Sequence, residues 1–164
     1  MNVSIYENVI KDIDGYVIDI IDNGFQDIQV GDDLFKNVSQ RGLDELVDFL
    51  STKYKDYYPV LNFVRKSPLN QEEPNFIHTD EMMGDLTAVL YLNKTYPSGY
   101  GTTIYDKDNN EVLICKAKYN SLIIFPSHVK HSRNSIHNFG TGNDARLIQV
   151  CFLKKIIWIQ RKLS

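Results

Sequence analysis

Two histidines and one aspartate stand out in this sequence because their types and spacing could hold a metal ion. His78 and Asp80 are two residues apart. In a β-strand, residues i and i+2 point to the same face, so this imidazole and this carboxylate would converge. His131 follows in a later β-rich stretch and could complete the set. Two imidazoles and one carboxylate form the facial triad of non-haem Fe(II) centres, which leaves open positions on the metal.

Other histidines compete for the third position. His128 lies three residues before His131, so the two imidazoles point to opposite faces of a regular strand, and only one reaches the metal unless a bulge intervenes. Strand geometry alone does not choose between them, whereas His137, which borders a turn, is expected to lie at the surface. By itself the His78-Thr79-Asp80 triplet would also fit a polar strand end with an ion-paired histidine.

The segments that precede these residues show helical periodicity. In residues 12–21 apolar side chains recur at spacings of three and four with aspartates between them, as an amphipathic helix requires, and Asp12 could cap it. Residues 41–52 show a second apolar stripe. We therefore predict a helical N-terminal part over about residues 1–58.

After Pro59 the pattern changes to short β-rich runs separated by Gly, Pro, Asn and Asp. The predicted strands cover residues 60–64, 76–78, 87–92, 102–105, 111–115, 121–125, 129–136 and 146–153. About eight short strands favour a sandwich or jelly roll, with the N-terminal helices packed on one sheet. The fold class is then α+β and mainly β, in a single domain over residues 1–164 with its core at about 60–153.

The net charge of −3 hides an uneven distribution. Residues 1–50 carry 3 basic and 11 acidic side chains, whereas residues 116–164 carry 9 and 1. We interpret this as two solvated faces that attract each other in the fold. The alternative is that the basic last third steers an anionic ligand or nucleic acid. Because basic clusters interleaved with exposed aromatics are missing, nucleic acid is not an expected partner.

The two cysteines and the hydropathy pattern indicate the setting of the protein. Cys115 and Cys151 each lie in an apolar stretch, so we predict buried free thiols, with a disulfide as the alternative. No apolar run approaches the roughly 18 residues that span a bilayer, and the first residues lack the pattern of a signal peptide. We expect a soluble, cytoplasmic protein with no membrane partner and an undetermined oligomeric state.

Several motifs together resemble a known family. They are His78-Thr79-Asp80, Tyr91-Leu92-Asn93, Gly99-Tyr100-Gly101-Thr102-Thr103, Ile124-Phe125-Pro126 leading to His131, and Arg146 in the last apolar strand. In this order and spacing they resemble the 2-oxoglutarate- and Fe(II)-dependent dioxygenases of the prolyl 4-hydroxylase-like branch, over about residues 60–153. The resemblance implies a double-stranded β-helix, a jelly roll of eight strands.

The resemblance also assigns roles to individual residues. It implies that His78, Asp80 and His131 hold the iron. It implies that Arg146 pairs with the distal carboxylate of 2-oxoglutarate, and that Tyr91 donates its hydroxyl to the same carboxylate. An arginine suits this role because its guanidinium is a fixed fork of donors that stays charged when half-buried.

The implied reaction uses Fe(II), the co-substrate 2-oxoglutarate and dioxygen, with ascorbate as a candidate reductant. Oxidative decarboxylation of 2-oxoglutarate gives succinate and carbon dioxide, and the acceptor is hydroxylated. The sequence does not identify the acceptor, which we expect to be peptidyl or a small molecule. A non-catalytic metal-binding jelly roll or a metal-dependent hydrolase are the alternatives, and both leave Arg146 unexplained.

Some features depart from the family or keep two interpretations. The segment from His131 to Arg146 is longer than is common in this branch, and the extra residues fall in the loop 138–144. Arg133 shares the strand face of His131 and could contact substrate or a surface acid. Arg65 and Asn62 fit polar side chains at a sheet edge or ligand contacts. Residues 66–75 resemble a flexible rim.

Overall fold

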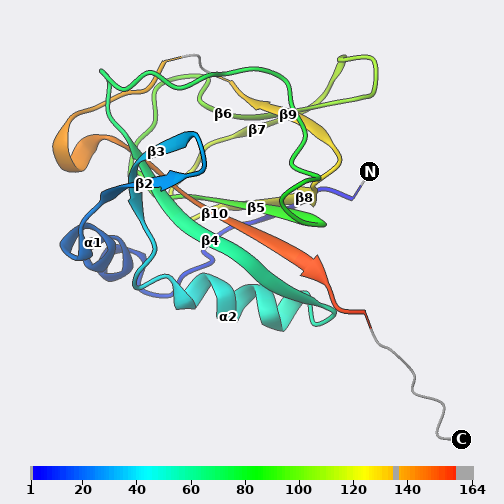
Figure 1. Cartoon of the computed structure of the whole chain (residues 1–164), viewed down its shortest axis with the longest axis horizontal. Helices are drawn as coiled ribbons and strands as arrows, with labels where there is room; N and C mark the ends of the chain where they lie inside the picture. The colour runs from blue at the N-terminus through cyan, green and yellow to red at the C-terminus, as the bar shows by residue number, and fades with distance from the viewer. Residues whose placement is uncertain (1, 135–136, 158–164) are drawn as a thin grey trace, which may run out of the picture.

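Two antiparallel β-sheets lie face to face in the structure (Figure 1). It is a computed structural model that describes residues 2–134 and 137–157. Within these residues the large sheet has seven strands in the order β1-β8-β5-β10-β4-β3-β2, and the small sheet has three in the order β7-β6-β9. The large sheet comprises β1 (Ser4–Tyr6), β2 (Gln26–Val30), β3 (Asp33–Ser39), β4 (Tyr57–Ser67), β5 (Leu86–Tyr91), β8 (Leu122–Pro126) and β10 (Arg146–Lys155). The small sheet comprises β6 (Gly101–Tyr105), β7 (Glu111–Lys116) and β9 (Lys130–Arg133).

Two helices, α1 (Ile13–Asn23) and α2 (Asp44–Lys53), lie on the side of the large sheet that faces away from the small sheet (Figure 1). The Asp12 carboxylate accepts a hydrogen bond from the Gly15 N–H over 3.1 Å and so caps α1, as predicted. The apolar stripes of both helices are buried against the sheet. The fully buried members include Ile20, Leu46 and Leu50.

Each face of the large sheet therefore has its own apolar core. The core under the helices includes Val64, Leu90 and Cys151. The core between the two sheets includes Tyr91, Ile104, Ile123, Phe125 and Val129. Because strand residues alternate between the two faces, neighbours in sequence contribute to different cores.

This architecture confirms the predicted fold class, a mainly β jelly roll with N-terminal helices packed on one sheet. The prediction of a helical N-terminal part over about residues 1–58 missed the strands β1, β2 and β3 and the start of β4. Strand β1 extends the large sheet beside β8, and the β2–β3 hairpin extends its opposite edge beside β4. Most side chains of β2 are exposed, so this strand has no buried face and lacks the apolar alternation by which strands are recognised in sequences.

Two predicted strands around the candidate metal ligands also differ from the structure. Residues 76–78 do not form a strand, because their only pairing is an isolated bridge between His78 and His131. Strand β9 ends at Arg133, so it is shorter than the predicted 129–136, and residues 135–136 lie outside the described residues.

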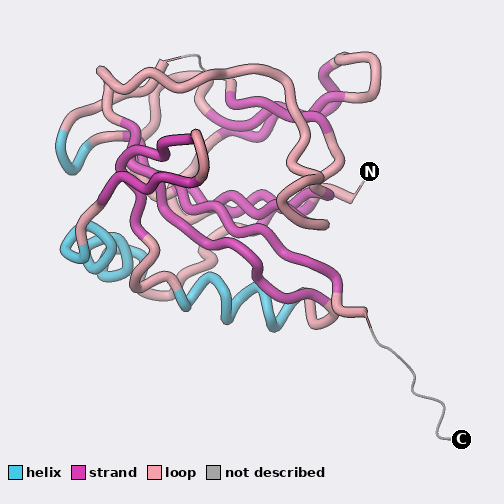
Figure 2. The backbone as a smooth tube through the Cα atoms, in the orientation of Figure 1, coloured by secondary structure: helices cyan, strands magenta, loops and turns pink. Residues whose placement is uncertain are grey.

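The connection between β4 and β5 has neither helix nor extended strand (Figure 2). The sequence predicted a flexible rim over residues 66–75, but Lys66 and Ser67 belong to β4. The loop that follows is tied to other elements by hydrogen bonds. The Leu69 N–H donates to the Gly140 carbonyl over 2.9 Å, and the Asn138 side chain donates to the Gln71 carbonyl over 2.6 Å. The prediction of a loose rim is therefore wrong for this segment.

Both cysteines are free and buried, as predicted. Cys115 belongs to the core between the sheets and Cys151 to the core under the helices. Among the described residues, none of the helices has the length and apolar character needed to cross a bilayer.

Candidate metal centre

His78, Asp80 and His131 come together at one end of the space between the two sheets. The His131 Nε2 atom lies 3.0 Å from Asp80 Oδ2, and the His78 Nε2 atom lies 3.5 Å from Asp80 Oδ1. One ligand atom from each of the three residues lies within 4.8 Å of the other two. The two imidazole rings are 4.3 Å apart between centroids. These distances fit three ligands arranged around one cation.

Backbone hydrogen bonds bring the loop ligands to the strand ligand. The His78 and His131 backbones are paired, and the Asp80 N–H donates to the Ser127 carbonyl over 2.8 Å. The sequence argument placed His78 and Asp80 on one face of a strand. In the structure an isolated bridge and a turn achieve the same convergence without a regular strand.

The second nitrogen of each imidazole is held by the backbone. His78 Nδ1 lies 2.9 Å from the Phe76 carbonyl oxygen, and His131 Nδ1 lies 3.0 Å from the Val129 carbonyl oxygen. With a metal bound, Nδ1 of the neutral ring would carry the proton and donate it to the carbonyl, which leaves the Nε2 lone pair for the cation. Metal-binding histidines are oriented by this kind of outer contact, so both rings are prepared for ligation.

The electrostatics of the centre favour an ionised carboxylate. Burial alone would raise the pKa of the Asp80 carboxyl, but the hydrogen bonds from His131 and His78 lower it by more, so the pKa lies well below its ordinary value. The hydrogen bond to Asp80 in turn raises the pKa of His78. Without a bound cation, the carboxylate is thus partnered by its two histidine neighbours.

The competing histidines lie elsewhere. His128 is exposed in the turn before β9 and is not part of the cluster, as we expected. His137 is exposed. Glu81, which follows Asp80, is also exposed.

The exposure of the centre itself is uneven: the His78 side chain is 37% exposed and the His131 side chain 9%, so the centre opens to solvent on the His78 side.

Arg146 begins β10 on the face of the large sheet that faces the small sheet. It pairs with Ser67 of β4, and its guanidinium NH1 donates to the Ser67 hydroxyl over 3.3 Å. Tyr91 lies on the same face, opposite Ile148 of β10. The Tyr91 hydroxyl is 2.6 Å from the Thr102 hydroxyl, and burial raises its pKa. Arg146 and Tyr91 therefore both lie on the face of the large sheet that faces the small sheet, the sheet that carries His131.

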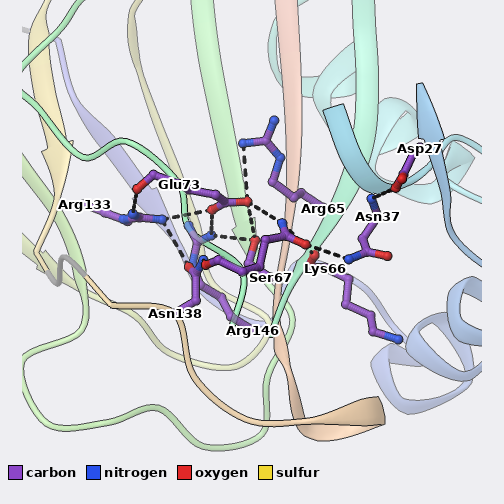
Figure 3. A network of polar contacts seen from close by, with 10 residues as sticks. Asp27, Asn37, Arg65, Lys66, Ser67, Glu73, Arg133, Asn138 and Arg146 are labelled. Atoms are coloured by element: carbon purple, nitrogen blue, oxygen red, sulfur yellow. Dashed lines mark hydrogen bonds and ion pairs between the residues drawn. The ribbon is translucent and has the colours of Figure 1, made fainter. Parts of the chain in front are cut away.

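Two further arginines join Arg146 around one carboxylate, that of Glu73 (Figure 3). Arg133 follows His131 on the same face of β9, and its NH1 lies 3.0 Å from Glu73 Oε2. Arg65 precedes Ser67 on β4, and its NH1 lies 3.7 Å from Glu73 Oε1. The acid that Arg133 meets is thus a largely buried residue of the β4–β5 loop. Asn62, by contrast, accepts a hydrogen bond from Gln149 on the helix-facing side, so its role is structural.

Sequence reasoning missed Glu73 and Tyr100. Glu73 was placed in the supposed flexible rim, and its only local signal is its position five residues before His78. Tyr100 was named only as part of the motif Gly99-Tyr100-Gly101-Thr102-Thr103. Its side chain is buried beside Arg146, whose guanidinium carbon lies 5.6 Å from the ring centroid. The Tyr100 hydroxyl has no hydrogen-bond partner among the described residues.

Comparisons with known proteins are informative at the level of fold. No protein-family model and no curated protein matches the sequence. Among solved structures, the chain is similar to the non-haem α-ketoglutarate-dependent epimerase SnoN from nogalamycin biosynthesis, with a TM-score of 0.63 and 9% identity over 92% of this chain and 76% of that one. It is also similar to a Pseudomonas putida prolyl-4-hydroxylase, with a TM-score of 0.58 and 14% identity over 92% of this chain and 91% of that one. A Trichoplax adhaerens prolyl hydroxylase in complex with a peptide fragment gives a TM-score of 0.57 and 17% identity over 92% of this chain and 82% of that one.

These similarities agree with the motif resemblance. The chain has the jelly-roll fold of the 2-oxoglutarate- and Fe(II)-dependent oxygenases, a group that includes prolyl hydroxylases. In the candidate His-Asp-His cluster, the His131 ring of β9 packs against Phe125 of β8, between the two sheets of that fold.

Proposed function

We propose that this protein is an Fe(II)- and 2-oxoglutarate-dependent dioxygenase that hydroxylates a peptidyl or small-molecule acceptor. The observation that carries the proposal is the orientation of the two imidazole rings in the cluster of His78, Asp80 and His131. Both histidines have Nδ1 against a backbone carbonyl and Nε2 beside the Asp80 carboxylate. Imidazole and carboxylate ligands in a two-to-one ratio suit Fe(II) and leave positions open for other ligands.

The residues present also fit the co-substrate. Arg146 offers a buried guanidinium beside the Tyr100 ring, and it shares the Glu73 carboxylate with Arg65 and Arg133. Four buried polar atoms of these residues lack partners among the described residues: the Nε atoms of Arg65, Arg133 and Arg146 and the Tyr100 hydroxyl oxygen. The three Nε–H groups can only donate and the Tyr100 hydroxyl can also donate, so a ligand that supplies acceptors would satisfy them. A carboxylate supplies them, and 2-oxoglutarate carries a second carboxylate at the end remote from its 2-oxo acid group.

In this mechanism the protein would bind the iron, orient 2-oxoglutarate and shield the centre from solvent. His78, Asp80 and His131 would hold the iron, and Arg146 would anchor the distal carboxylate of 2-oxoglutarate. When bound, iron and 2-oxoglutarate supply the oxidative chemistry, in which one oxygen atom of dioxygen enters succinate, the other enters the acceptor C–H bond, and carbon dioxide is released. Phe125 packs against the His131 ring at 4.6 Å between centroids, and together with Ile104 it makes the inner side of the centre apolar.

The acceptor would approach from the exposed side of the centre. Phe76 is 61% exposed and its ring lies 5.2 Å from that of His78, while Met82 and Met83 are also exposed beyond Asp80. This exposed apolar surface favours an acceptor with an apolar portion. It does not favour a nucleic acid, because phosphates require cationic side chains.

The decisive experiment is the conversion of 2-oxoglutarate into succinate by purified protein with Fe(II), dioxygen and ascorbate. We expect slow turnover without an acceptor and none for Asp80→Ala. Binding of Fe(II) without binding of 2-oxoglutarate would instead indicate a metal-binding jelly roll. Metal-dependent hydrolysis with no use of 2-oxoglutarate would indicate a hydrolase.

A further inference from the structure

The three arginines around Glu73 are not balanced in charge. Three guanidinium groups carry three positive charges, and Glu73 is the carboxylate that contacts all three. The side chains of Arg146, Arg133 and Glu73 are 7, 11 and 11% exposed, so this charge is largely removed from water. A buried excess of positive charge attracts further anions.

Glu73 is held firmly, but unequally, by its partners (Figure 3). Its Oε1 atom accepts hydrogen bonds from Ser67 and Gln71, each over 2.8 Å. Its Oε2 atom is shared: Arg133 NH1 lies at 3.0 Å and Arg146 NH1 at 3.5 Å. Arg133 also donates to the backbone carbonyl of Glu73 over 2.9 Å. The contact with Arg146 is thus longer than the hydrogen bonds around it, and Glu73 can lose it while the others stay.

The pKa of Glu73 agrees with these contacts. Burial alone would raise the pKa of its carboxyl, but Arg65, Ser67, Arg146 and Gln71 together lower it below its ordinary value. The side chain is therefore an anion at neutral pH, and it presents a carboxylate to the guanidinium that the co-substrate is proposed to use.

We propose that Glu73 is an internal carboxylate ligand of Arg146 that competes with the distal carboxylate of 2-oxoglutarate and so sets the affinity for the co-substrate. The inference rests on the proposed function. Binding of 2-oxoglutarate breaks the contact between Glu73 and Arg146, and Glu73 stays with Arg133, Ser67 and Gln71.

Two different roles for Glu73 predict opposite changes in 2-oxoglutarate affinity when its charge is removed, so an experiment can distinguish them. If Glu73 only oriented Arg146, removal of its charge would misplace the guanidinium and weaken 2-oxoglutarate binding. If it competes, removal of its charge strengthens binding, because a carboxylate arriving at Arg146 no longer meets a second anion on the same NH1 atom. Repulsion between two such charges is strong in a partly desolvated site. The Ser67 hydroxyl, which also contacts Arg146, keeps the guanidinium in place in either case.

The experiment compares wild type with Glu73→Gln by calorimetric titration of Fe(II)-loaded protein with 2-oxoglutarate in the absence of dioxygen. Glutamine keeps an acceptor oxygen for Ser67 and Gln71 but removes the charge. We expect the dissociation constant for 2-oxoglutarate to fall by about ten-fold, a change that corresponds to about 1.4 kcal/mol. The exposed neighbour Glu72 is the matched control, and Glu72→Gln should leave the constant unchanged.

A second ligand separates competition from general changes of the site. Pyruvate has the 2-oxo acid group but no distal carboxylate, so Glu73→Gln should not alter its binding. Unchanged pyruvate binding also shows that the variant is folded and loaded with metal. Should Glu73→Gln not yield folded protein, Glu73→Asp keeps the charge and withdraws it by one methylene, and it should tighten 2-oxoglutarate binding by a smaller factor.

The outcomes separate this inference from the proposed function. Unchanged or weaker 2-oxoglutarate binding by the variants, with normal binding by wild type, would overturn the competition and leave the dioxygenase proposal standing. An equal gain for pyruvate would also overturn it, because the effect would not involve the distal carboxylate. A wild type that binds Fe(II) but neither 2-oxo acid would reject the proposed function itself.

Discussion

The backbones of His78 and His131 are joined by a reciprocal pair of hydrogen bonds. The His78 N–H donates to the His131 carbonyl over 3.0 Å, and the His131 N–H donates to the His78 carbonyl over 2.9 Å. This bridge fixes a loop residue against strand β9 and brings the two imidazole rings to 4.3 Å between centroids, with their planes inclined at 55°. The geometry of the candidate centre therefore depends on a contact between segments that are far apart in the sequence.

Removal of any one of the three proposed ligands should abolish tight Fe(II) binding. Loss of an outer-shell partner costs about 10- to 100-fold in metal affinity, and loss of a direct ligand should cost more. We therefore expect His78→Ala, Asp80→Ala and His131→Ala to bind Fe(II) at least about 100-fold more weakly and to produce no succinate. Anaerobic titration with Fe(II) measures the first effect. His128→Ala is the control, and loss of iron by this variant alone would contradict the assignment.

Arg146→Ala should weaken the use of 2-oxoglutarate without weakening the metal site. A hydrogen bond to a charged group contributes about 1.5 to 3 kcal/mol, so the 2-oxoglutarate concentration for half-maximal turnover should rise by at least about ten-fold. Arg146→Lys should recover part of the loss, because an ammonium cannot pair with both carboxylate oxygens. Tyr91→Phe should give a smaller shift and also leaves the Thr102 hydroxyl without its partner. An unchanged titration for Arg146→Ala would place the anchor elsewhere, with Arg65 and Arg133 the next candidates.

Glu73 should make the stability of the protein dependent on pH in the acid range. The folded-state pKa of its carboxyl is lowered from the ordinary value of 4.5, so the unfolded chain binds the proton more readily. Its contribution is therefore complete above pH 4.5 and is lost as the pH falls through the folded-state pKa. Urea unfolding of wild type and Glu73→Gln should show a difference of about 1 to 3 kcal/mol at neutral pH that shrinks on acidification. A difference that grows at low pH would contradict the assigned ion pairs.

Tyr16 tests the packing between α1 and the large sheet. Its hydroxyl donates to Gln149 Oε1 over 2.5 Å in the buried core, and burial raises its pKa. Tyr16→Phe leaves the Gln149 oxygen without this donor and should destabilise the fold by about 1 to 3 kcal/mol in thermal or urea unfolding. Tyr119→Phe removes an exposed hydrogen bond to Asp14 and should change stability by less than about 0.5 kcal/mol. Equal effects of the two substitutions would show that burial does not control the loss of folding stability.

The uneven charge distribution should not produce tight nucleic-acid binding. Lys118 of the basic last third pairs with Glu7 of the acidic first part at 3.1 Å, an interaction that agrees with mutual attraction of the two parts. In a gel-shift assay at low salt we expect no retained complex with single- or double-stranded DNA or RNA. A complex that weakens with salt by about one power per phosphate contact would overturn the proposal of a peptidyl or small-molecule acceptor.

The sequence alone was sufficient for the elements whose pattern is local. The stripes of α1 and α2 and the β-rich runs of the two sheets follow from apolar periodicity, which reports which face of an element is buried. The candidate metal ligands could also be predicted, because His78 and Asp80 are two residues apart and His131 follows a recognisable strand. Arg146 was found by resemblance, and the structure shows it buried at the start of β10, paired with Ser67 of β4.

Only the tertiary structure decided features that depend on distant partners. Strands β2 and β3 form mostly exposed additions at a sheet edge, and an edge strand with no buried face leaves little hydrophobic pattern in its sequence. The pairing of His78 with His131 replaces the predicted strand at residues 76–78. The position of Glu73 is set by Arg133, 60 residues away along the chain, and by Arg65 and Arg146 on neighbouring strands. A charge acts through space rather than along the chain, so no local pattern could show that one loop carboxylate contacts three arginines.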